Sequence, residues 1–359
     1  MDGYGPRAPL PRGATVEAPD PEEPAMPTAA ATPGTSTTPG TAIAENAIDL
    51  VGRTPLVRIG RLLHDDDGTP PPATVLGKLE VANPGSSVKD RTALAIVRAA
   101  EADGRLRPGG TILEATSGNT GIAFAWIGAL LGYRVVIVLP DDVSVERRAL
   151  IRSFGADLVL TPGADGMAGA NQYANRLVEE DPSIFLSGQG GNPANPDIHF
   201  STTGPEIWAD TGGRVDAVVA TTGTGGTLSG AGRFLRTKNP DVRIIGVEPA
   251  EAPVLSGGEW QPHKIQGITG GNGVPPVTDM ELIDEIVTVP QDEAIGWARR
   301  AARTEGLLLG VSSGAALHAA ARLACRPEFA GSTIVAILPD GGERYVSAEL
   351  FDHVRGDQG

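Results

Sequence analysis

Short apolar β-rich segments alternate with helical segments along most of this chain, and this alternation constrains the fold more than any other feature. Strands separated by helices usually pair in parallel, with helices covering both faces of the sheet. We therefore expect an α/β protein. The strands are expected at residues 75–79, 110–114, 135–139, 158–160, 215–221, 243–247 and 333–338, and the helices at 92–102, 121–131, 144–154, 228–237, 292–305 and 314–324.

The first 42 residues have a different composition from the rest. They are rich in Pro, Ala and Thr and show no apolar periodicity, which predicts a disordered tail over 1–42. They lack the basic start and apolar core of a secretion signal, so we expect a cytoplasmic protein. The polar stretch 188–196 is the best candidate boundary between an N-terminal α/β domain at 43–190 and a C-terminal α/β domain at 191–355.

Composition narrows the classes of partner. A formal net charge of -15 over 359 residues disfavours nucleic acid, and apolar runs such as 123–131 are too short to span a membrane. The single cysteine, Cys325, excludes a disulfide within the chain, and we expect it to be buried. The five histidines are scattered, so we expect no metal site.

Lys89 lies where a lysine is unfavourable. Gly85, Ser86 and Ser87 indicate a helix start, which places Lys89 in or near the first turn. Helix N-termini carry partial positive charge and disfavour an ammonium group. A lysine in such a place has a lowered pKa and can act as a neutral amine or form a Schiff base. A solvated surface lysine is the alternative.

A polar loop at 114–121 lies between an expected strand and an expected helix. Its hydroxyl groups and the exposed N–H groups of a helix start suit a carboxylate or a phosphate. Capping of the helix is the alternative explanation. The candidate ligand-binding residues of this loop are Thr116, Ser117, Asn119 and Thr120.

A glycine-rich loop at 221–227 follows an apolar strand and precedes a helix, which is the arrangement of a phosphate cradle. A dinucleotide site is the alternative, because Glu248 ends the next strand at about the distance of a ribose contact. Leu228 stands where that fingerprint requires its third glycine, so the match fails there. In a fourth stretch, 310–316, Ser312 either caps the following helix or contacts a ligand.

Taken in this order, these stretches resemble the cysteine synthase (O-acetylserine sulfhydrylase) family of fold type II enzymes, which use pyridoxal 5'-phosphate. The resemblance runs from about residue 46 to residue 352 and includes the segments 52–56, 192–196 and 339–345. It implies two three-layer α/β domains with mostly parallel sheets, as in the tryptophan synthase β-subunit. The Schiff-base lysine and the carboxylate loop would lie in 43–190, and the phosphate-binding loop in 191–355.

The resemblance also implies a role for each matching residue. Lys89 would be the catalytic residue and would form a Schiff base with the cofactor. Asn119 would hydrogen-bond the ring hydroxyl, and Ser312 would contact the pyridine nitrogen. The phosphate would be held by Gly223, Thr224, Gly225, Gly226 and Thr227, and the substrate carboxylate by Thr116, Ser117, Thr120 and Gln189.

These roles are chemically consistent. A neutral hydroxyl at the pyridine nitrogen leaves that nitrogen largely unprotonated, so the ring is a weaker electron sink and prompt loss of a β leaving group is favoured. Lys89, once displaced by substrate, would be a free amine able to take the α-proton. The implied reaction is a ping-pong β-replacement in which O-acetylserine and sulfide give L-cysteine and acetate.

Three positions depart from the family pattern. Gly190 follows Gln189 where Phe is usual, Gly341 stands where Phe is frequent, and the loop 269–273 is one residue longer than usual and lacks Phe. Glycine in place of an aromatic residue removes apolar wall. Our hypothesis is a wider or wetter pocket that accepts a nucleophile bulkier than sulfide.

Several functional alternatives remain. Within the same fold they are β-replacement with O-phosphoserine as donor, or with homocysteine or an amine as nucleophile. A NAD-dependent oxidoreductase is supported only by the glycine loop and Glu248, and a non-catalytic binding module is a third alternative. The family suggests a homodimer and a serine acetyltransferase partner.

Overall fold

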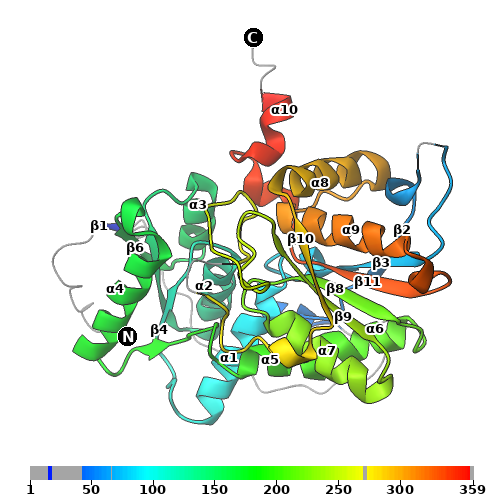
Figure 1. Ribbon diagram of the computed structural model, residues 1–359. Helices are drawn as coiled ribbons and strands as arrows, with labels where there is room; N and C mark the ends of the chain where they lie inside the picture. Colours follow the sequence, from blue (N-terminus) through cyan, green and yellow to red (C-terminus); the bar gives the residue numbers. More distant parts are fainter. Residues whose placement is uncertain (1–14, 18–42, 66, 270–272, 356–359) are drawn as a thin grey trace.

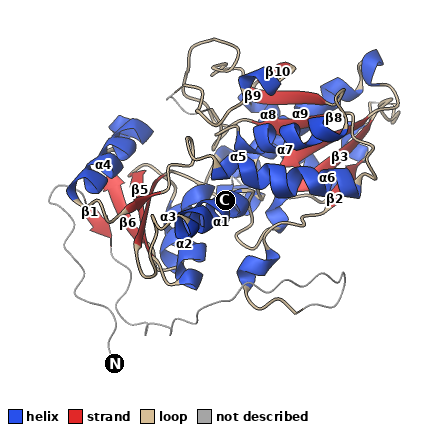
Figure 2. Ribbon diagram, turned by 90° about the horizontal axis from the view of Figure 1, so that it is seen from below, coloured by secondary structure: helices blue, strands red, loops and turns tan. Residues whose placement is uncertain are grey.

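Two β-sheets lie side by side in the computed structural model, each with helices packed against it (Figures 1 and 2). The structure describes residues 15–17, 43–65, 67–269 and 273–355. Each sheet is mostly parallel, which confirms the predicted α/β class.

The first sheet has five strands in the order β1-β6-β5-β4-β7. The strands β4 to β7 pair in parallel, whereas β1 pairs antiparallel with β6. Helices α1, α2 and α3 pack on one face and α4 on the other. The bounds are β1 (Thr15–Glu17), β4 (Thr111–Ala115), β5 (Arg134–Pro140), β6 (Asp157–Thr161), β7 (Phe185–Leu186), α1 (Lys89–Ala102), α2 (Asn119–Leu131), α3 (Val145–Ser153) and α4 (Gly166–Glu180).

The second sheet has six strands in the order β10-β9-β8-β11-β3-β2, of which only β2 runs antiparallel to its neighbour. Helices α8 and α9 cover one face, and α6 and α7 the other. The bounds are β2 (Leu56–Ile59), β3 (Thr74–Leu79), β8 (Ala217–Thr221), β9 (Arg243–Pro249), β10 (Glu285–Val289), β11 (Thr333–Leu338), α6 (Gly204–Asp210), α7 (Gly226–Lys238), α8 (Gln291–Glu305) and α9 (Val311–Ala324).

Shorter helices connect these elements. A π-helical turn, η5 (His199–Thr203), joins α5 (Ala194–Ile198) to α6, and α10 (Asp352–Arg355) ends the described chain. The 3-10 turns are η1 (Ala47–Leu50), η2 (Arg61–Leu63), η3 (Glu80–Ala82), η4 (Gly163–Asp165), η6 (Met280–Leu282), η7 (Pro327–Phe329), η8 (Gly342–Tyr345) and η9 (Glu349–Phe351).

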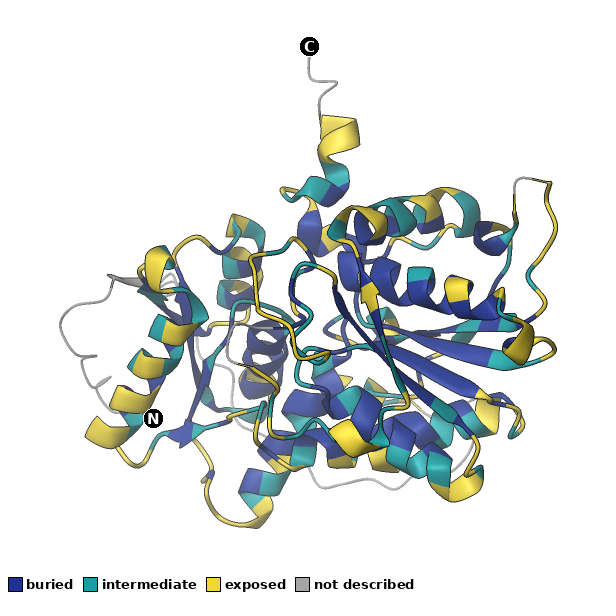
Figure 3. Ribbon diagram, in the orientation of Figure 1, coloured by how far each residue is buried: buried dark blue, intermediate teal, exposed yellow. Residues whose placement is uncertain are grey.

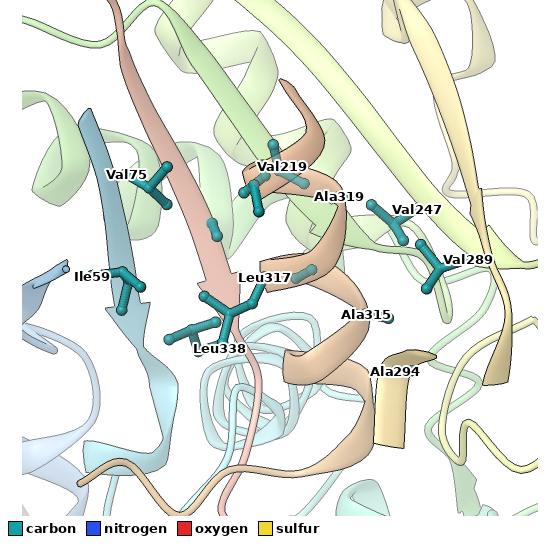
Figure 4. Close-up of a cluster of buried hydrophobic side chains, with 14 of the residues drawn as sticks. Ile59, Val75, Val219, Val247, Val289, Ala294, Ala315, Leu317, Ala319 and Leu338 are labelled. Carbon is teal, nitrogen blue, oxygen red and sulfur yellow. The ribbon is translucent and has the colours of Figure 1, made fainter. Parts of the chain in front are cut away.

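The strand β11 shows how the core forms. Successive side chains of a strand point to opposite faces, so an uninterrupted apolar strand needs cover on both sides. Ile334 and Leu338 belong to the apolar cluster under α9, whereas Val335 and Ile337 belong to the cluster under α7. Figure 4 shows the α9 side, with Leu317 near Leu338, and Figure 3 shows that the central strands of the second sheet are largely buried.

Some expectations need correction. The second sheet takes β2 and β3 from the segment 43–190, so the predicted domain boundary at residue 190 does not coincide with the division between sheets. Hydrophobic alternation reveals a strand but not the sheet that it joins. Residues 15–17 form a strand rather than disordered chain, while the rest of 1–42 lies outside the described residues. Cys325 is exposed, contrary to expectation, because it follows the last residue of α9.

Candidate active site

A pocket lies where the carboxyl ends of strands from both sheets meet. Strand β4 leads into the loop 116–118, β7 leads to Gln189, and β8 leads into the glycine loop before α7. Ligands of parallel α/β sheets commonly bind at such ends. The predicted residues that line this pocket are Lys89, Thr116, Ser117, Asn119, Thr120, Gln189, Thr224, Thr227 and Ser312. The predicted Gly223, Gly225 and Gly226 belong to the same loop as Thr224.

Lys89 is the first residue of α1 and lies in the pocket wall. Burial lowers the pKa of its amine, while the charges of Asp340 and Glu80 act in the opposite direction. The predicted direction is confirmed, but the main cause is burial rather than the helix terminus. Among the described residues, Nζ of Lys89 has no hydrogen-bond or ion-pair partner. The amine is therefore available to a ligand.

The backbone before Lys89 is fixed by the end of β11. The Val88 N–H donates to the Pro339 carbonyl at 2.9 Å, and Ser87 forms a β-bridge with Asp340. Asp90 accepts from the Gly85 N–H at 2.5 Å and from the Trp126 indole at 3.1 Å. These contacts join the start of α1 to the end of β11 and to helix α2, and so set the position of the amine.

A chain of hydrogen bonds connects the polar loop 114–121, the expected site of the substrate carboxylate, to Gln189 and Ser187. The Thr120 hydroxyl donates to Oε1 of Gln189 at 2.9 Å, and Nε2 of Gln189 donates to Oε1 of Glu114 at 2.8 Å. The Ser187 hydroxyl donates to the other oxygen of Glu114. Burial raises the pKa of Glu114 to about 7, although hydrogen bonds from Ser187, Gln189 and the Gly188 N–H oppose the shift.

Asn119 is held at both ends of its amide. Its Nδ2 donates to Oδ2 of Asp340 at 2.7 Å, and its Oδ1 accepts from Nη1 of Arg344 at 2.7 Å. Asp340 also accepts from the Tyr345 hydroxyl at 2.5 Å. One N–H of Asn119 therefore stays free for a ligand in the pocket.

The glycine loop packs so closely that side chains are excluded. A Cβ atom at Gly226 would lie 2.2 Å from Oδ1 of Asn195, and one at Gly223 would lie 2.5 Å from the Gly267 carbonyl. Gly225 has a φ of +77°, which favours glycine. Within the described chain, the N–H groups of Gly223 to Gly225 donate to no acceptor, and α7 begins at Gly226. Free N–H groups at a helix start form an anion site.

The dinucleotide alternative does not fit this geometry. Glu248 is fully buried and accepts from the Leu255 N–H at 2.7 Å and from the Ser256 hydroxyl at 2.5 Å. Its carboxylate stabilises the turn at 252–256 and is not available to a ribose.

The described residues provide neither a metal site nor a membrane-spanning helix. They contain no group of three or more His, Cys, Asp and Glu side chains able to hold a metal ion. None of the described helices is long and apolar enough to cross a bilayer.

Comparisons with known proteins agree with one another. The family model described as "Pyridoxal-phosphate dependent enzyme" matches residues 48–340. This chain belongs to that family. A cysteine synthase from Staphylococcus aureus is 46% identical over 308 residues, which cover 86% of this chain and 97% of the relative.

Solved structures support the same family assignment for this chain. The cysteine synthase of Entamoeba histolytica has a TM-score of 0.83 at 42% identity, covering 89% of this chain and 94% of the other. An O-ureido-L-serine synthase has a TM-score of 0.83 at 46% identity, covering 89% and 98%. Both are fold type II enzymes, as the sequence motifs indicate.

The pocket fits the cofactor of this family. The free N–H groups of the glycine loop suit its phosphate, the unpartnered amine of Lys89 suits its aldehyde, and the free N–H of Asn119 suits its ring hydroxyl. The Ser312 hydroxyl has no partner among the described residues and lines the same pocket. The cofactor of this enzyme is pyridoxal 5'-phosphate.

Several residues near the pocket carry no motif that assigns them a role. The segment 339–345 is part of the family resemblance, but its sequence did not predict that Asp340 and Arg344 contact Asn119. His199, in the π-helical turn, lies 3.2 Å from the Thr227 hydroxyl, and burial lowers its pKa well below the usual value. Arg147 donates to the Ser117 carbonyl at 3.2 Å and stacks on Tyr345.

Proposed function

We propose that this chain is a cysteine synthase, which replaces the acetoxy group of O-acetylserine with sulfide and releases L-cysteine and acetate. The observation that carries this proposal is the unpartnered amine of Lys89, with a lowered pKa, in a pocket that also contains the anion-binding glycine loop. The 46% identity to a cysteine synthase over 308 residues supports it.

We assign the chemical roles as follows. Bound pyridoxal phosphate withdraws electrons from the α-carbon of the amino acid that it carries. Lys89 takes the α-proton as a neutral amine, the form that the lowered pKa favours. The substrate carboxylate is held by the loop residues Thr116, Ser117 and Thr120 and by Gln189. Ser312 lines the same pocket, and its neutral hydroxyl would serve the pyridine nitrogen.

Spectroscopy of the holoenzyme tests this function. Addition of O-acetylserine should change the cofactor's absorption spectrum, and addition of sulfide should then restore it with one L-cysteine formed per acetate released. The absence of any spectral change with O-acetylserine would reject the proposal and favour a non-catalytic binding module.

A bulkier nucleophile is a second candidate. Among the described residues, a Cβ at Gly190 would have only the Pro275 Cβ nearby, at 3.9 Å, so they leave open space at this position beside Gln189. Gly341 differs, because a Cβ there would lie 2.4 Å from Oε2 of Glu343. Residues 270–272 of the third departing segment lie outside the described residues. The chain is as similar to an O-ureido-L-serine synthase as to a cysteine synthase, 46% identical to each, so identity alone does not separate the two candidates.

A nucleophile panel separates the two candidates. Sulfide, homocysteine, hydroxyurea and a primary amine are compared by kcat/KM, with O-acetylserine and then O-phosphoserine as donor. If the open space at Gly190 matters, Gly190→Phe should lower kcat/KM for the larger nucleophiles and leave that for sulfide nearly unchanged. An exclusive preference of the natural enzyme for sulfide rejects the second candidate.

We also propose a cytoplasmic homodimer that associates with a serine acetyltransferase, on the basis of the family resemblance. Light scattering of the purified enzyme measures the first association, and its binding to the acetyltransferase's C-terminal peptide measures the second. A monomer that does not bind this peptide would contradict both associations.

A further inference from the structure

Glu114 is a buried carboxylate outside the pocket wall that the roles above do not use. It is the fourth residue of β4 and is 3% exposed. Its side chain lies on the α2 face of the sheet, since Ile112, two residues earlier, belongs to the apolar cluster under α2. Burying an ionised carboxylate is costly unless a cation is near.

Among the described residues, no cation contributes to the pKa of Glu114, because its causes are burial and three hydrogen bonds. The arginines of α1 and α3, on the same face of the sheet, are not among those causes. Helix α2 contains no charged residue, β7 consists of Phe185 and Leu186, and Glu114 lies opposite Ile137 of β5. Arg134 at the far end of β5 pairs with Asp157. The charged residues of α4, which packs on the other face, are exposed: Arg176, Glu179 and Glu180. The charges that line the pocket, those of Lys89, Arg147 and Asp340, are not among the causes that shift its pKa.

The surroundings of Glu114 can accommodate either protonation state. The Ser187 hydroxyl contacts one carboxyl oxygen and also lies 3.3 Å from the Leu113 carbonyl. It can donate to an ionised Glu114, or accept from a protonated one while it donates to Leu113. In both states the second oxygen of Glu114 accepts from Nε2 of Gln189. A proton can therefore be gained or lost without breaking the chain of hydrogen bonds.

One N–H of the Gln189 amide donates to Glu114, and the Thr120 hydroxyl donates to the amide oxygen. A carboxylate held by the remaining N–H of Gln189 would lie one hydrogen-bonded residue from Glu114. Two carboxylates at such a distance in a buried site repel each other, and one of them favours the protonated form. We propose that Glu114 is a positioning residue that acts through Gln189 and that takes up one proton from solvent when the substrate's carboxylate binds. This inference rests on the proposed function, because it requires an amino-acid carboxylate at Gln189.

The shifted pKa of Glu114, about 7, supports this coupling because the group titrates near neutral pH. Above that pH the free enzyme must first gain the proton, so its affinity for the carboxylate falls. Below it the proton is already present and affinity is independent of this group.

The test measures the dissociation constant of L-serine, a substrate analogue without a good leaving group, on the holoenzyme by titration calorimetry. The natural enzyme and Glu114→Gln are compared from about pH 6 to about pH 8.5. The dissociation constant of the natural enzyme, divided by that of the variant, is expected to rise about tenfold over this range. Because both proteins contain Lys89 and bind the same ligand, the effects of their titration on the two dissociation constants cancel in this ratio. With L-serinamide, which has no carboxylate, the ratio should stay flat.

Two further measurements keep the inference falsifiable. Titrations in buffers of different ionisation enthalpy should show more proton uptake by the natural enzyme than by the variant at the higher pH. Ser187→Ala retains Glu114 but loses a donor to its ionised form, so the pH midpoint should move upward; this variant serves if Glu114→Gln does not fold.

A ratio that is flat with pH for L-serine, or that rises equally for L-serinamide, overturns the inference and leaves Glu114 with a structural role only. The proposed function fails in a different way: O-acetylserine then produces no spectral change in the natural enzyme.

Discussion

Single residues set the chemistry of this pocket, and burial raises the pKa of Glu114 even against three opposing hydrogen bonds. In the folded protein the carboxyl group of Glu114 has a pKa of about 7, whereas the ordinary pKa of a glutamate is 4.5. Stability therefore falls as pH rises through this window, because only the unfolded chain can release the proton freely.

Glu114→Gln should thus be more stable than the natural protein above pH 7, by about 3 kcal/mol, and nearly equal to it below pH 4.5. Denaturant unfolding at the two pH extremes measures the difference. Glu179→Gln, an exposed change on α4, is the control and should show no such pH dependence. A constant difference at all pH values would contradict the assigned shift.

Gly226 is a second single residue on which the pocket depends, because its surroundings leave no room for a side chain. Gly226→Ala would place a Cβ 2.2 Å from the Asn195 amide and displace the N–H groups of the cradle, so cofactor affinity should fall at least tenfold, a loss of about 1.4 kcal/mol. Fluorescence titration of the apoprotein with pyridoxal phosphate measures it. Gly296→Ala, in α8 with no atom near its Cβ, should leave affinity unchanged and stabilise the helix by about 0.5–1 kcal/mol.

The contacts of the site residues explain what the sequence could and could not predict. Lys89, Asn119 and the glycine loop were predictable, because each lies in a local motif at a strand or helix end. The positions of Asp340 and Arg344 were not, since they contact Asn119 across 221 and 225 residues of sequence. Such pairs arise from the fold and leave no local pattern.

At the scale of elements, an ion-pair network joins α1 to α6. Arg91 pairs with Glu80 at 2.8 Å and with Glu206 at 2.6 Å, and Lys78 pairs with Glu206 at 2.9 Å. Burial alone would raise the pKa of Glu206, but hydrogen bonds and charges from Arg91 and Lys78 lower it to about 2. Because α1 begins at Lys89, this network also holds the reactive amine in place.

Arg91→Met should leave the buried Glu80 without a cationic partner and Glu206 with Lys78 alone of its two, and so destabilise the fold by about 3–5 kcal/mol. The change is measured as the free energy of unfolding in denaturant. Arg98→Met lies on the same helix and removes an exposed pair with Glu101, so its effect should stay below about 1 kcal/mol. Equal effects of the two changes would contradict a special role for the buried network.

Elements with a continuous apolar run were predicted within a few residues, among them β3, β5, β11 and α9. Elements with a weaker pattern were not. Strand β7 has only two residues, β10 is flanked by polar chain, and α4 has small and polar residues in its first turns. Tertiary packing rather than local preference forms these elements.

At the scale of the whole molecule, the cofactor should hold the two sheets together. Lys89 and Asn119 begin helices α1 and α2, which pack on the first sheet, whereas the glycine loop and Ser312 belong to the second sheet and its helix α9. Removal of pyridoxal phosphate should therefore lower Tm in a single transition, and pyridoxal without the phosphate should restore less of the loss. Calorimetry of the three samples measures this, and two separate transitions in the holoenzyme would contradict a bridging role.

The measurement that tests the account most directly is reduction of the purified holoenzyme with borohydride, followed by peptide mass spectrometry. One phosphopyridoxyl group per chain is predicted, on Lys89. None is predicted on Lys78, whose buried amine donates a hydrogen bond to the Thr54 carbonyl at 2.5 Å. Label on another lysine, or an unmodified Lys89 in cofactor-saturated protein, would contradict it.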